Sequence, residues 1–141
     1  MIREYRASDQ EEVIAVWLAS SVVAHPFIEE EVWKSHTDDL RKKYLPNADT
    51  WLWEDGGRVI GFIALIGNYI GGLFILPEWQ GRGIGTQLIK LAQSERGGLT
   101  VGVYAKNKKA QDFYASCGFV YESEEMQQET GEIVITMKNA I

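Results

Sequence analysis

The sequence predicts an α/β (α+β) protein with a mixed, mostly antiparallel sheet, and three observations support this fold class. The chain has 141 residues, of which 45% are hydrophobic and 24% are charged, as in an ordinary globular domain with one buried core. Helical and strand periods of apolar residues alternate along the chain. Short turns join these segments without linkers, repeats or low-complexity stretches, so we expect a single domain over residues 1–141.

The amino-terminal segment predicts one strand and one helix. Residues 2–6 alternate apolar and polar side chains, as a strand with one buried face does. Ser8 and Glu11 have the spacing of a capping box, in which the two side chains bond each other's backbone amides at the start of a helix. Pro26 disfavours helix at His25, so this helix should end there. Its apolar stripe follows helical spacing and consists of Val13, Ile14, Trp17 and Leu18.

A second helix is expected over residues 29–44. Trp33, Leu40 and Tyr44 would lie on one side of this helix, and Pro46 would end it. From residue 50 onward, the apolar residues follow the period of strands rather than that of helices.

The second half of the chain predicts a hairpin followed by alternating strands and helices. Two β-rich runs flank the turn 55–57, Asp-Gly-Gly, and predict the hairpin. Strand 69–76 would stop at Pro77 and lead through a glycine-rich turn into a helix that ends at residues 97–98, Gly-Gly. The later elements are strand 99–104, helix 107–117 capped by Asn107, and strands 119–121 and 133–137. The order is β-α-α-β-β-β-α-β-α-β-β, and a right-handed crossover should make strands 69–76 and 99–104 parallel.

Composition narrows the range of functions. The net charge of −6 argues against binding to nucleic acid or an anionic membrane, because both need a basic face. No apolar run approaches the ~20 residues of a membrane-spanning helix, and residues 1–5 lack the features of a signal peptide, so we expect a cytoplasmic protein. Neither His25 nor His36 has the spaced Cys or carboxylate partners of a metal site, so we expect no metal.

The glycine-rich turn between a strand and a helix is a candidate anion site. Amides at a helix start lack partners, the helix dipole favours negative charge there, and glycines let the backbone approach a phosphate closely. Arg82 would add a charge-assisted bond, although a connection without any ligand is the alternative for the loop alone. Its spacing matches neither the G-x-G-x-x-G of dinucleotide-binding proteins nor the G-x-x-x-x-G-K-[ST] of P-loops. The turn reads Gln80-Gly81-Arg82-Gly83-Ile84-Gly85.

The turn does match the Q/R-x-x-G-x-G/A motif of the GCN5-related N-acetyltransferase (GNAT) superfamily. Residues 73–77, Leu-Phe-Ile-Leu-Pro, resemble that family's bulged fourth strand, which runs into the loop. Residues 107–119 resemble its N-x-x-A-x-x-F-Y-x-x-x-G-F segment, and the spacing of the two blocks and the element order resemble the family as well. The resemblance covers essentially the whole chain. Residues 25–28, His-Pro-Phe-Ile, followed by Trp33, also resemble a segment of a bacterial subgroup of this family, whose single-domain members are proposed to acetylate protein lysines or small amines.

This resemblance implies acetyl-CoA as co-substrate. In the family the fourth and fifth strands splay apart, and the pantetheine arm enters the gap as if it were a strand. Backbone groups of Phe74 and Ile75 would bond this arm, and the amides of residues 81–86 would hold the pyrophosphate. Asn107 is either a helix cap alone or a cap that also contacts the pantetheine. The implied cofactor contacts are Phe74, Ile75, Gln80, Gly81, Arg82, Gly83, Ile84, Gly85, Thr86, Asn107 and Tyr114.

The implied reaction is attack of a neutral amine on the thioester carbonyl, which gives an oxyanion and then a thiolate. An amide near Ile75 would stabilise the oxyanion. Tyr114 would be the catalytic residue that protonates the leaving sulfur, and a purely structural role in the core is its alternative. Strand residues 73–76 offer no carboxylate, so the general base is left unassigned.

The acceptor is expected to be a primary amine, either a protein lysine or N-terminus or a small-molecule amine. Its candidate contacts are His25, Phe27 and Trp33. His25 is either a base or an acceptor contact, or a residue that only hydrogen-bonds the loop. A non-catalytic acyl-CoA-binding or regulatory module is the alternative function, and the sequence is compatible with a monomer or a homodimer.

Overall fold

Seven strands form one sheet in the computed structural model, which describes residues 1–139. The order across the sheet is β1-β2-β3-β4-β5-β7-β6, and every neighbouring pair is antiparallel except β4 and β5. This arrangement confirms the expected mixed sheet and its one parallel pair. The strands are β1 (Ile2–Glu4), β2 (Asp49–Asp55), β3 (Arg58–Ile66), β4 (Tyr69–Ile75), β5 (Leu99–Tyr104), β6 (Val120–Met126) and β7 (Ile133–Asn139).

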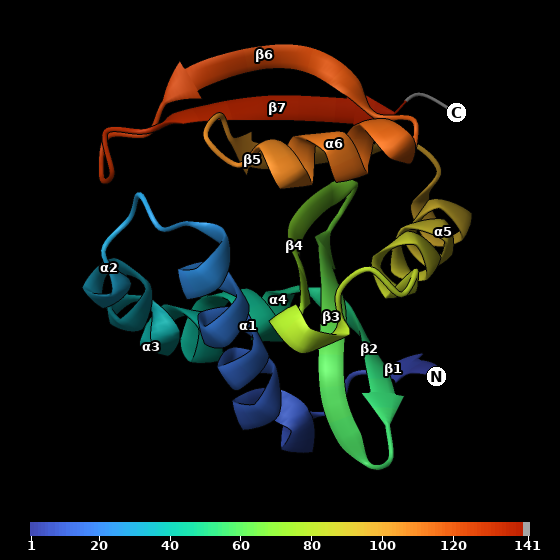
Figure 1. Cartoon of the computed structure of the whole chain (residues 1–141). Coiled ribbons are helices and arrows are strands. Elements are labelled where there is room, and N and C mark those ends of the chain that lie inside the picture. Colours follow the sequence, from blue (N-terminus) through green and yellow to red (C-terminus); the bar gives the residue numbers. More distant parts are fainter. Residues whose placement is uncertain (140–141) are drawn as a thin grey trace.

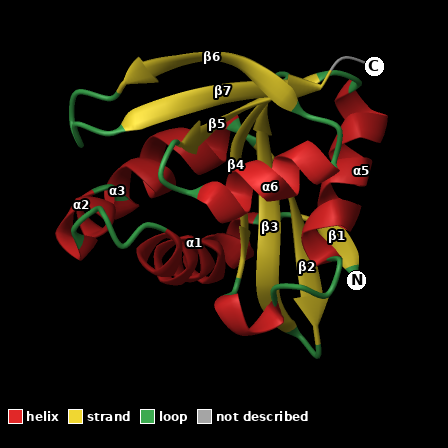
Figure 2. Ribbon diagram, turned by 45° about the horizontal axis from the view of Figure 1, so that its top comes forward, coloured by secondary structure: helices red, strands yellow, loops and turns green. Residues whose placement is uncertain are grey.

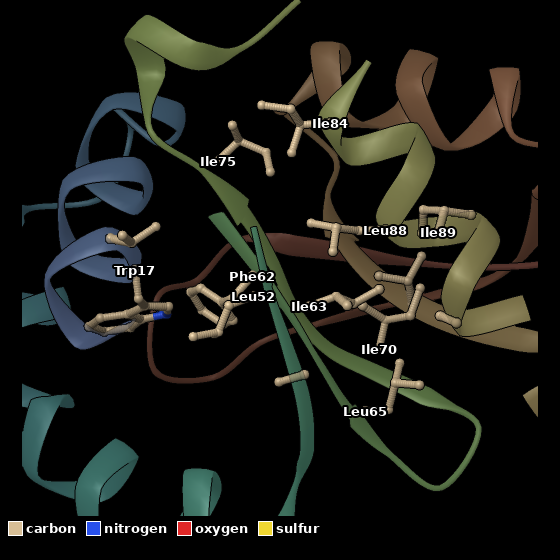
Figure 3. Packing of buried hydrophobic residues seen from close by; sticks show 14 of the residues in the cluster. Trp17, Leu52, Phe62, Ile63, Leu65, Ile70, Ile75, Ile84, Leu88 and Ile89 are labelled. Carbon is tan, nitrogen blue, oxygen red and sulfur yellow. The ribbon is translucent and has the colours of Figure 1, made fainter. Parts of the chain in front are cut away.

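Helices lie on both faces of the sheet (Figure 1, Figure 2). The α-helices are α1 (Gln10–Ala24), α2 (Glu30–Ser35), α3 (Thr37–Asp39), α4 (Leu45–Asn47), α5 (Ile84–Arg96) and α6 (Lys108–Ser116). In Figure 3, Trp17 of α1 approaches Leu52 and Phe62 from one side of the central strands, and Leu88 and Ile89 of α5 approach from the other. The core therefore lies between the sheet and a helix on each side, and β3 at its centre is almost wholly buried.

The sheet opens between β4 and β5. These strands pair only at Tyr69 with Thr100 and at Ile70 with Val101. Beyond Ile70 the two strands diverge, so the sheet consists of one group of strands from β1 to β4 and another from β5 to β7 (Figure 1). We call this gap the splay.

The first helix begins differently from the expected capping box. A 3₁₀ turn spans Ala7–Asp9, and α1 starts at Gln10 rather than directly behind Ser8. The Asp9 carboxylate accepts the Arg6 N–H at 2.8 Å and pairs with the Arg3 guanidinium at 2.8 Å. An ionised carboxylate is a better acceptor than the Ser8 hydroxyl, so the predicted Ser8–Glu11 box is wrong and Asp9 takes its place.

The second helix is interrupted. The chain forms α2, α3, a π-helical turn over Leu40–Tyr44 and then α4, instead of one helix over residues 29–44. Trp33 and Leu40 pack against the core as expected, but Tyr44 is half exposed. Pro46 lies within α4, and the helical run ends one residue later, at Asn47, so the end falls next to the expected position rather than at Pro46 itself.

The last two strands are longer than expected. β6 continues to Met126 through an acidic segment at the edge of the sheet, and this strand is exposed along its whole length. Apolar periodicity cannot detect a strand that buries no face. The first helix does end at His25, and within residues 1–139 no helix combines the length and apolarity needed to cross a bilayer.

Candidate active site

A cavity of about 620 Å³ opens in the splay. Its walls come from α1, β4, β5, the turn after β4, and the first turns of α5 and α6. The cavity has two ends: one lies at the amino terminus of α5, and the other lies at the carboxyl end of α1, beside His25 and Tyr104.

The first end carries unpaired backbone amides. Gly83 is the N-cap of α5 and has φ 81°, a left-handed conformation that favours glycine. The first helical bond of α5 joins the Gln87 N–H to the Gly83 carbonyl at 3.1 Å. The amides of Ile84, Gly85 and Thr86 precede this bond and have no helical acceptor, so they form an anion site at the positive end of the helix dipole.

Position 85 needs a residue without a Cβ atom because the Phe113 ring of α6 lies close to it. A Cβ atom on Gly85 would lie 3.1 Å from Cζ of the Phe113 ring, closer than ordinary van der Waals contact. The small residue therefore lets α5 and α6 approach each other where both line the cavity. This contact links the two sequence blocks, around Gly85 and around Phe113, that carry the family resemblance.

The side chains of the glycine-rich turn have structural partners. Gln80 donates from Nε2 to the Ile75 carbonyl at 3.0 Å, and its Oε1 accepts Lys109 Nζ at 2.8 Å. The Arg82 guanidinium lies over the Trp79 ring, 4.5 Å from its centroid, and donates to the Glu78 carbonyl. Gln80 lines the cavity, whereas Arg82 does not.

The peptide groups of β4 alternate between β3 and the splay. The Leu76 N–H bonds the Ile60 carbonyl of β3, and Phe74 pairs with Phe62 of β3. In an antiparallel ladder this register turns the Phe74 backbone toward β3 and the backbones of Leu73 and Ile75 away from it. The expectation that Phe74 backbone groups bond the arm thus does not fit this geometry, although the Phe74 side chain lines the cavity.

Leu73 and Ile75 consequently supply the strand groups that face the splay. The Ile75 carbonyl already accepts Ser20 Oγ at 3.1 Å and Gln80 Nε2 at 3.0 Å. The Ile75 amide and both peptide groups of Leu73 are the groups left for a ligand. Sequence reasoning missed Leu73, which the alternation of strand residues identifies once the pairing with β3 is known.

The second end of the cavity is a cluster of aromatic rings, here called the aromatic end. His25 packs against Trp33 with ring centroids 5.0 Å apart and against Tyr104 at 5.1 Å. Phe27 contacts His25 and Tyr104, both at 5.7 Å, from behind the cavity wall. The structure thus brings together the three predicted acceptor residues, and Trp33 Nε1 is buried without a hydrogen-bond partner.

Asn107 links the start of α6 to the aromatic end. Its Oδ1 accepts the Ala110 N–H at 3.1 Å, which confirms the predicted cap of α6. Its Nδ2 lies 3.3 Å from Nε2 of His25, a contact between segments 82 residues apart in the sequence.

Tyr114 is buried in α6 and lines the cavity. Its ring packs edge-on against Phe113 and Phe119. Burial raises the pKa of the Tyr114 phenol well above its usual value, and Cys117 and Tyr69 add smaller effects in the same direction. The phenol therefore stays protonated at neutral pH and is available as a donor.

Three further cavity residues were not anticipated. Tyr104 closes the aromatic end, Lys109 lies beside the glycine-rich turn, and Tyr69 stands where β4 and β5 still pair. Lys109 follows Asn107 on the first turn of α6, so its position in that block was an available signal. Tyr69 and Tyr104 lie at strand ends and look like ordinary strand residues in the sequence.

These features fit an acyl-CoA. A helix amino terminus with free amides suits a pyrophosphate, Lys109 adds positive charge, and the outward-facing groups of Leu73 and Ile75 suit an amide-containing arm. Within residues 1–139, no group of three or more His, Cys, Asp or Glu side chains is arranged to hold a metal ion.

Comparison with known proteins identifies the family. Residues 46–121, more than half of the chain, match the acetyltransferase (GNAT) domain family. Peptidyl-lysine N-acetyltransferase YiaC of Escherichia coli K12 is 36% identical over 120 residues, which cover 84% of this chain and 82% of YiaC. The solution structure of apo YjaB from E. coli has a TM-score of 0.85 at 28% identity and covers 98% of this chain and 95% of YjaB. PaiA N-acetyltransferase from Thermoplasma acidophilum, crystallised with coenzyme A, shares the fold with a TM-score of 0.82 at 21% identity, over 100% and 98% of the two chains. The chain belongs to the GNAT acetyltransferase family, whose members are acetyl-CoA-dependent N-acetyltransferases.

Proposed function

We propose that this protein transfers the acetyl group of acetyl-CoA to the side-chain amine of a peptidyl lysine. The observation that carries the proposal is one cavity that runs from the free amides of α5 through the splay to the aromatic end. A donor and an acceptor can therefore meet inside the sheet. The relatives YiaC and YjaB, 36% and 34% identical, are both peptidyl-lysine N-acetyltransferases, which supports lysine as the acceptor.

The walls of the aromatic end suit a lysine side chain. Rings of Trp33 and Tyr104 would pack against the four methylenes, while the nitrogen reaches the centre of the splay. The net charge of −6 favours the approach of a cationic acceptor.

The protein's own groups would perform three tasks in this reaction. The amides of Ile84, Gly85 and Thr86 would hold the donor's pyrophosphate, and the outward-facing amides of β4 would bond the acyl carbonyl as negative charge develops on its oxygen. One such donor is worth roughly 3 kcal/mol of barrier. Acetyl-CoA supplies the activated acyl group as a thioester, and Tyr114 would donate its phenolic proton to the departing sulfur.

The acceptor class is tested by following thiol release from acetyl-CoA with lysine peptides, peptides lacking lysine, and small primary amines. We expect turnover with lysine peptides and a mass increase of one acetyl group on the lysine. Turnover with small amines but not with lysine peptides would refute the lysine proposal. A lack of turnover with every amine tested would refute the transferase activity itself.

The role of Tyr114 is tested by Tyr114→Phe. Removing the phenolic proton should lower kcat by about 10²-fold or more, whereas the Kd for CoA should stay the same because the ring is retained. Tyr121→Phe is the matched control: Tyr121 is exposed on β6 and does not line the cavity, so its change should leave both constants unaltered. A Tyr114→Phe variant with normal kcat would show that Tyr114 is a packing residue.

A further inference from the structure

Five titratable side chains line the cavity among residues 1–139: His25, Tyr69, Tyr104, Lys109 and Tyr114. Among the described residues, no Asp or Glu lines the cavity. Burial raises the pKa values of the three tyrosines, so their phenols are donors at neutral pH, and Lys109 is a cation bonded to the Gln80 side chain. In the described part of the chain, His25 is therefore the one lining side chain with a basic atom that can take up a proton at neutral pH.

The carboxyl end of α1 holds the His25 ring in place. The His25 backbone N–H bonds the Ser21 carbonyl at 3.0 Å, and the ring atom Nδ1 lies 2.9 Å from the same oxygen. A carbonyl oxygen only accepts hydrogen bonds, so Nδ1 must carry the proton. In the neutral ring, the lone pair is then on Nε2.

Asn107 selects the same tautomer from the other side. The Ala110 N–H bonds Oδ1 of Asn107 at 3.1 Å, which leaves Nδ2 directed at Nε2 of His25, 3.3 Å away. An amide nitrogen only donates, so Nε2 must be the acceptor. The two contacts together fit the neutral tautomer in which Nδ1 carries the proton and Nε2 does not.

The surroundings of the ring favour its neutral form. Trp33, Phe27 and Tyr104 pack around the imidazole, and 7% of the His25 surface is exposed. Burial lowers the pKa of His25, and the bond to Ser21 opposes this effect only in part. The charged or titratable groups on this side are the Tyr104 phenol, the Lys106 ammonium, which lies 5.6 Å from the Phe27 ring centroid, and two carboxylates, Glu129 and Glu132, that act on Tyr104. Glu132 pairs with Lys106 and Glu129 with His36, so both carboxylates are engaged by other side chains rather than by the His25 imidazole.

We propose that His25 is the general base of the acetyl transfer and that Asn107 is the residue that positions it. This inference rests on the proposed function, because it needs an amine acceptor at the aromatic end. The arriving ammonium displaces the long Asn107 contact and becomes the donor to Nε2, in a stronger charge-assisted bond.

The acetyl transfer then begins with a proton transfer to His25. Nε2 takes one proton from the ammonium and becomes imidazolium, and the neutral amine nitrogen forms a bond to the acyl carbon. The carbon–sulfur bond breaks, the thiolate takes the Tyr114 proton, and the nitrogen loses its remaining extra proton to the phenolate. The imidazolium releases its proton to solvent after the products leave.

The first test compares the pH dependence of kcat/KM in wild type, His25→Gln and His36→Gln. The wild-type profile should have an acidic limb whose midpoint matches the pKa of the His25 imidazole measured by NMR in the free enzyme. His25→Gln should lower kcat/KM by about 10²-fold or more and lose this limb. His36, the other histidine of the chain, hydrogen-bonds Glu129 outside the cavity, so its variant should keep the wild-type profile. A His25→Gln enzyme that retains the acidic limb overturns the proposal.

Asn107→Asp tests the positioning role separately from helix capping. Aspartate caps a helix as well as asparagine does, so the Ala110 contact is kept. The new carboxylate beside Nε2 favours imidazolium, and we expect the NMR pKa of His25 and the acidic limb to move upward together. A limb that stays in place while the His25 pKa moves overturns the assignment of His25 as base.

Hydroxylamine separates loss of the base from damage to the fold. Its nitrogen is neutral at pH 7, so transfer to it needs no initial deprotonation, and His25→Gln should lose far less activity with hydroxylamine than with a lysine peptide. Equal losses with both acceptors overturn the proposal, and calorimetric CoA binding verifies that each variant is folded. If wild type acetylates only small amines, the lysine proposal fails while the same pH comparison with that amine still decides the role of His25. No transfer to any amine overturns both.

Discussion

The carbonyl oxygen of Ile75 accepts two side-chain hydrogen bonds, one from Ser20 on α1 and one from Gln80 in the glycine-rich turn. Gln80 belongs to the motif that identifies the family, and its amide here ties the end of β4 to the turn and, through Lys109, to α6. A residue expected to contact the cofactor thus also joins three parts of the cavity wall. Because Ser20 is buried, water cannot replace the hydrogen bond between its hydroxyl and the Ile75 carbonyl.

This shared acceptor predicts a non-additive effect on stability. Ser20→Ala and Gln80→Ala should each lower the free energy of unfolding by about 1 kcal/mol, because the other donor still satisfies Ile75. The double variant leaves that carbonyl unsatisfied and should lose about 1 kcal/mol more than the sum. Urea unfolding of wild type, the two single variants and the double variant, each without ligand, measures the free energies of this double-mutant cycle. Ser94→Ala is the control: it removes an exposed hydrogen bond within α5 and should change the free energy of unfolding by less than about 0.5 kcal/mol. If the effects of Ser20→Ala and Gln80→Ala are strictly additive, the two donors do not share the Ile75 carbonyl as acceptor.

At the scale of elements, the sequence predicted what depends on periodicity and turn chemistry. The hairpin after β2, the parallel pair β4 and β5, the α6 cap at Asn107 and the α5 end at Gly97 are all confirmed. The interruptions in residues 29–44 were missed because they depend on how Trp33 and Leu40 pack against the rest of the molecule. Local spacing carries no information about such contacts.

The candidate site was predictable to a similar extent. The glycine-rich turn and Tyr114 come from the motif, and both line the cavity. The orientation of the β4 backbone needed the register with β3, and the contact between His25 and Asn107 joins residues distant in sequence. Neither is visible until the chain is folded.

The alternation along β4 predicts a residue-specific pattern of amide hydrogen exchange. Without ligand, the amides of Leu73 and Ile75 face the splay and should exchange quickly, whereas the Phe74 amide is directed at β3 and should be protected. Saturating CoA should slow exchange at Leu73 and Ile75 and leave Phe74 unchanged. Exchange followed by NMR measures all three positions at once, and slowing at Phe74 alone would contradict the register.

For the whole molecule, burial of neutral His25 makes stability depend on pH. Its pKa is lowered in the folded state, so below its ordinary value of 6.5 the unfolded chain binds a proton that the folded chain does not. The free energy of unfolding should therefore fall as the pH drops below about 6.5 and be constant with respect to this group above it. Urea titrations of wild type and His25→Gln between pH 5 and 8 measure the difference, and His36→Gln serves as control. Identical slopes in wild type and His25→Gln would show that His25 is not neutral in the fold.

The two-residue pairing of β4 with β5 also bears on the order in which substrates bind. The aromatic end takes His25 and Trp33 from the α1 side and Tyr104 from β5, so its width depends on how far apart the two groups of strands stand. A donor that occupies the splay sets this separation before any lysine arrives. We therefore expect an obligatory sequence, acetyl-CoA first and peptide second, with initial-rate patterns of an ordered ternary-complex mechanism. Calorimetry should detect no lysine-peptide binding to the free enzyme and measurable binding once a non-transferable CoA analogue is present.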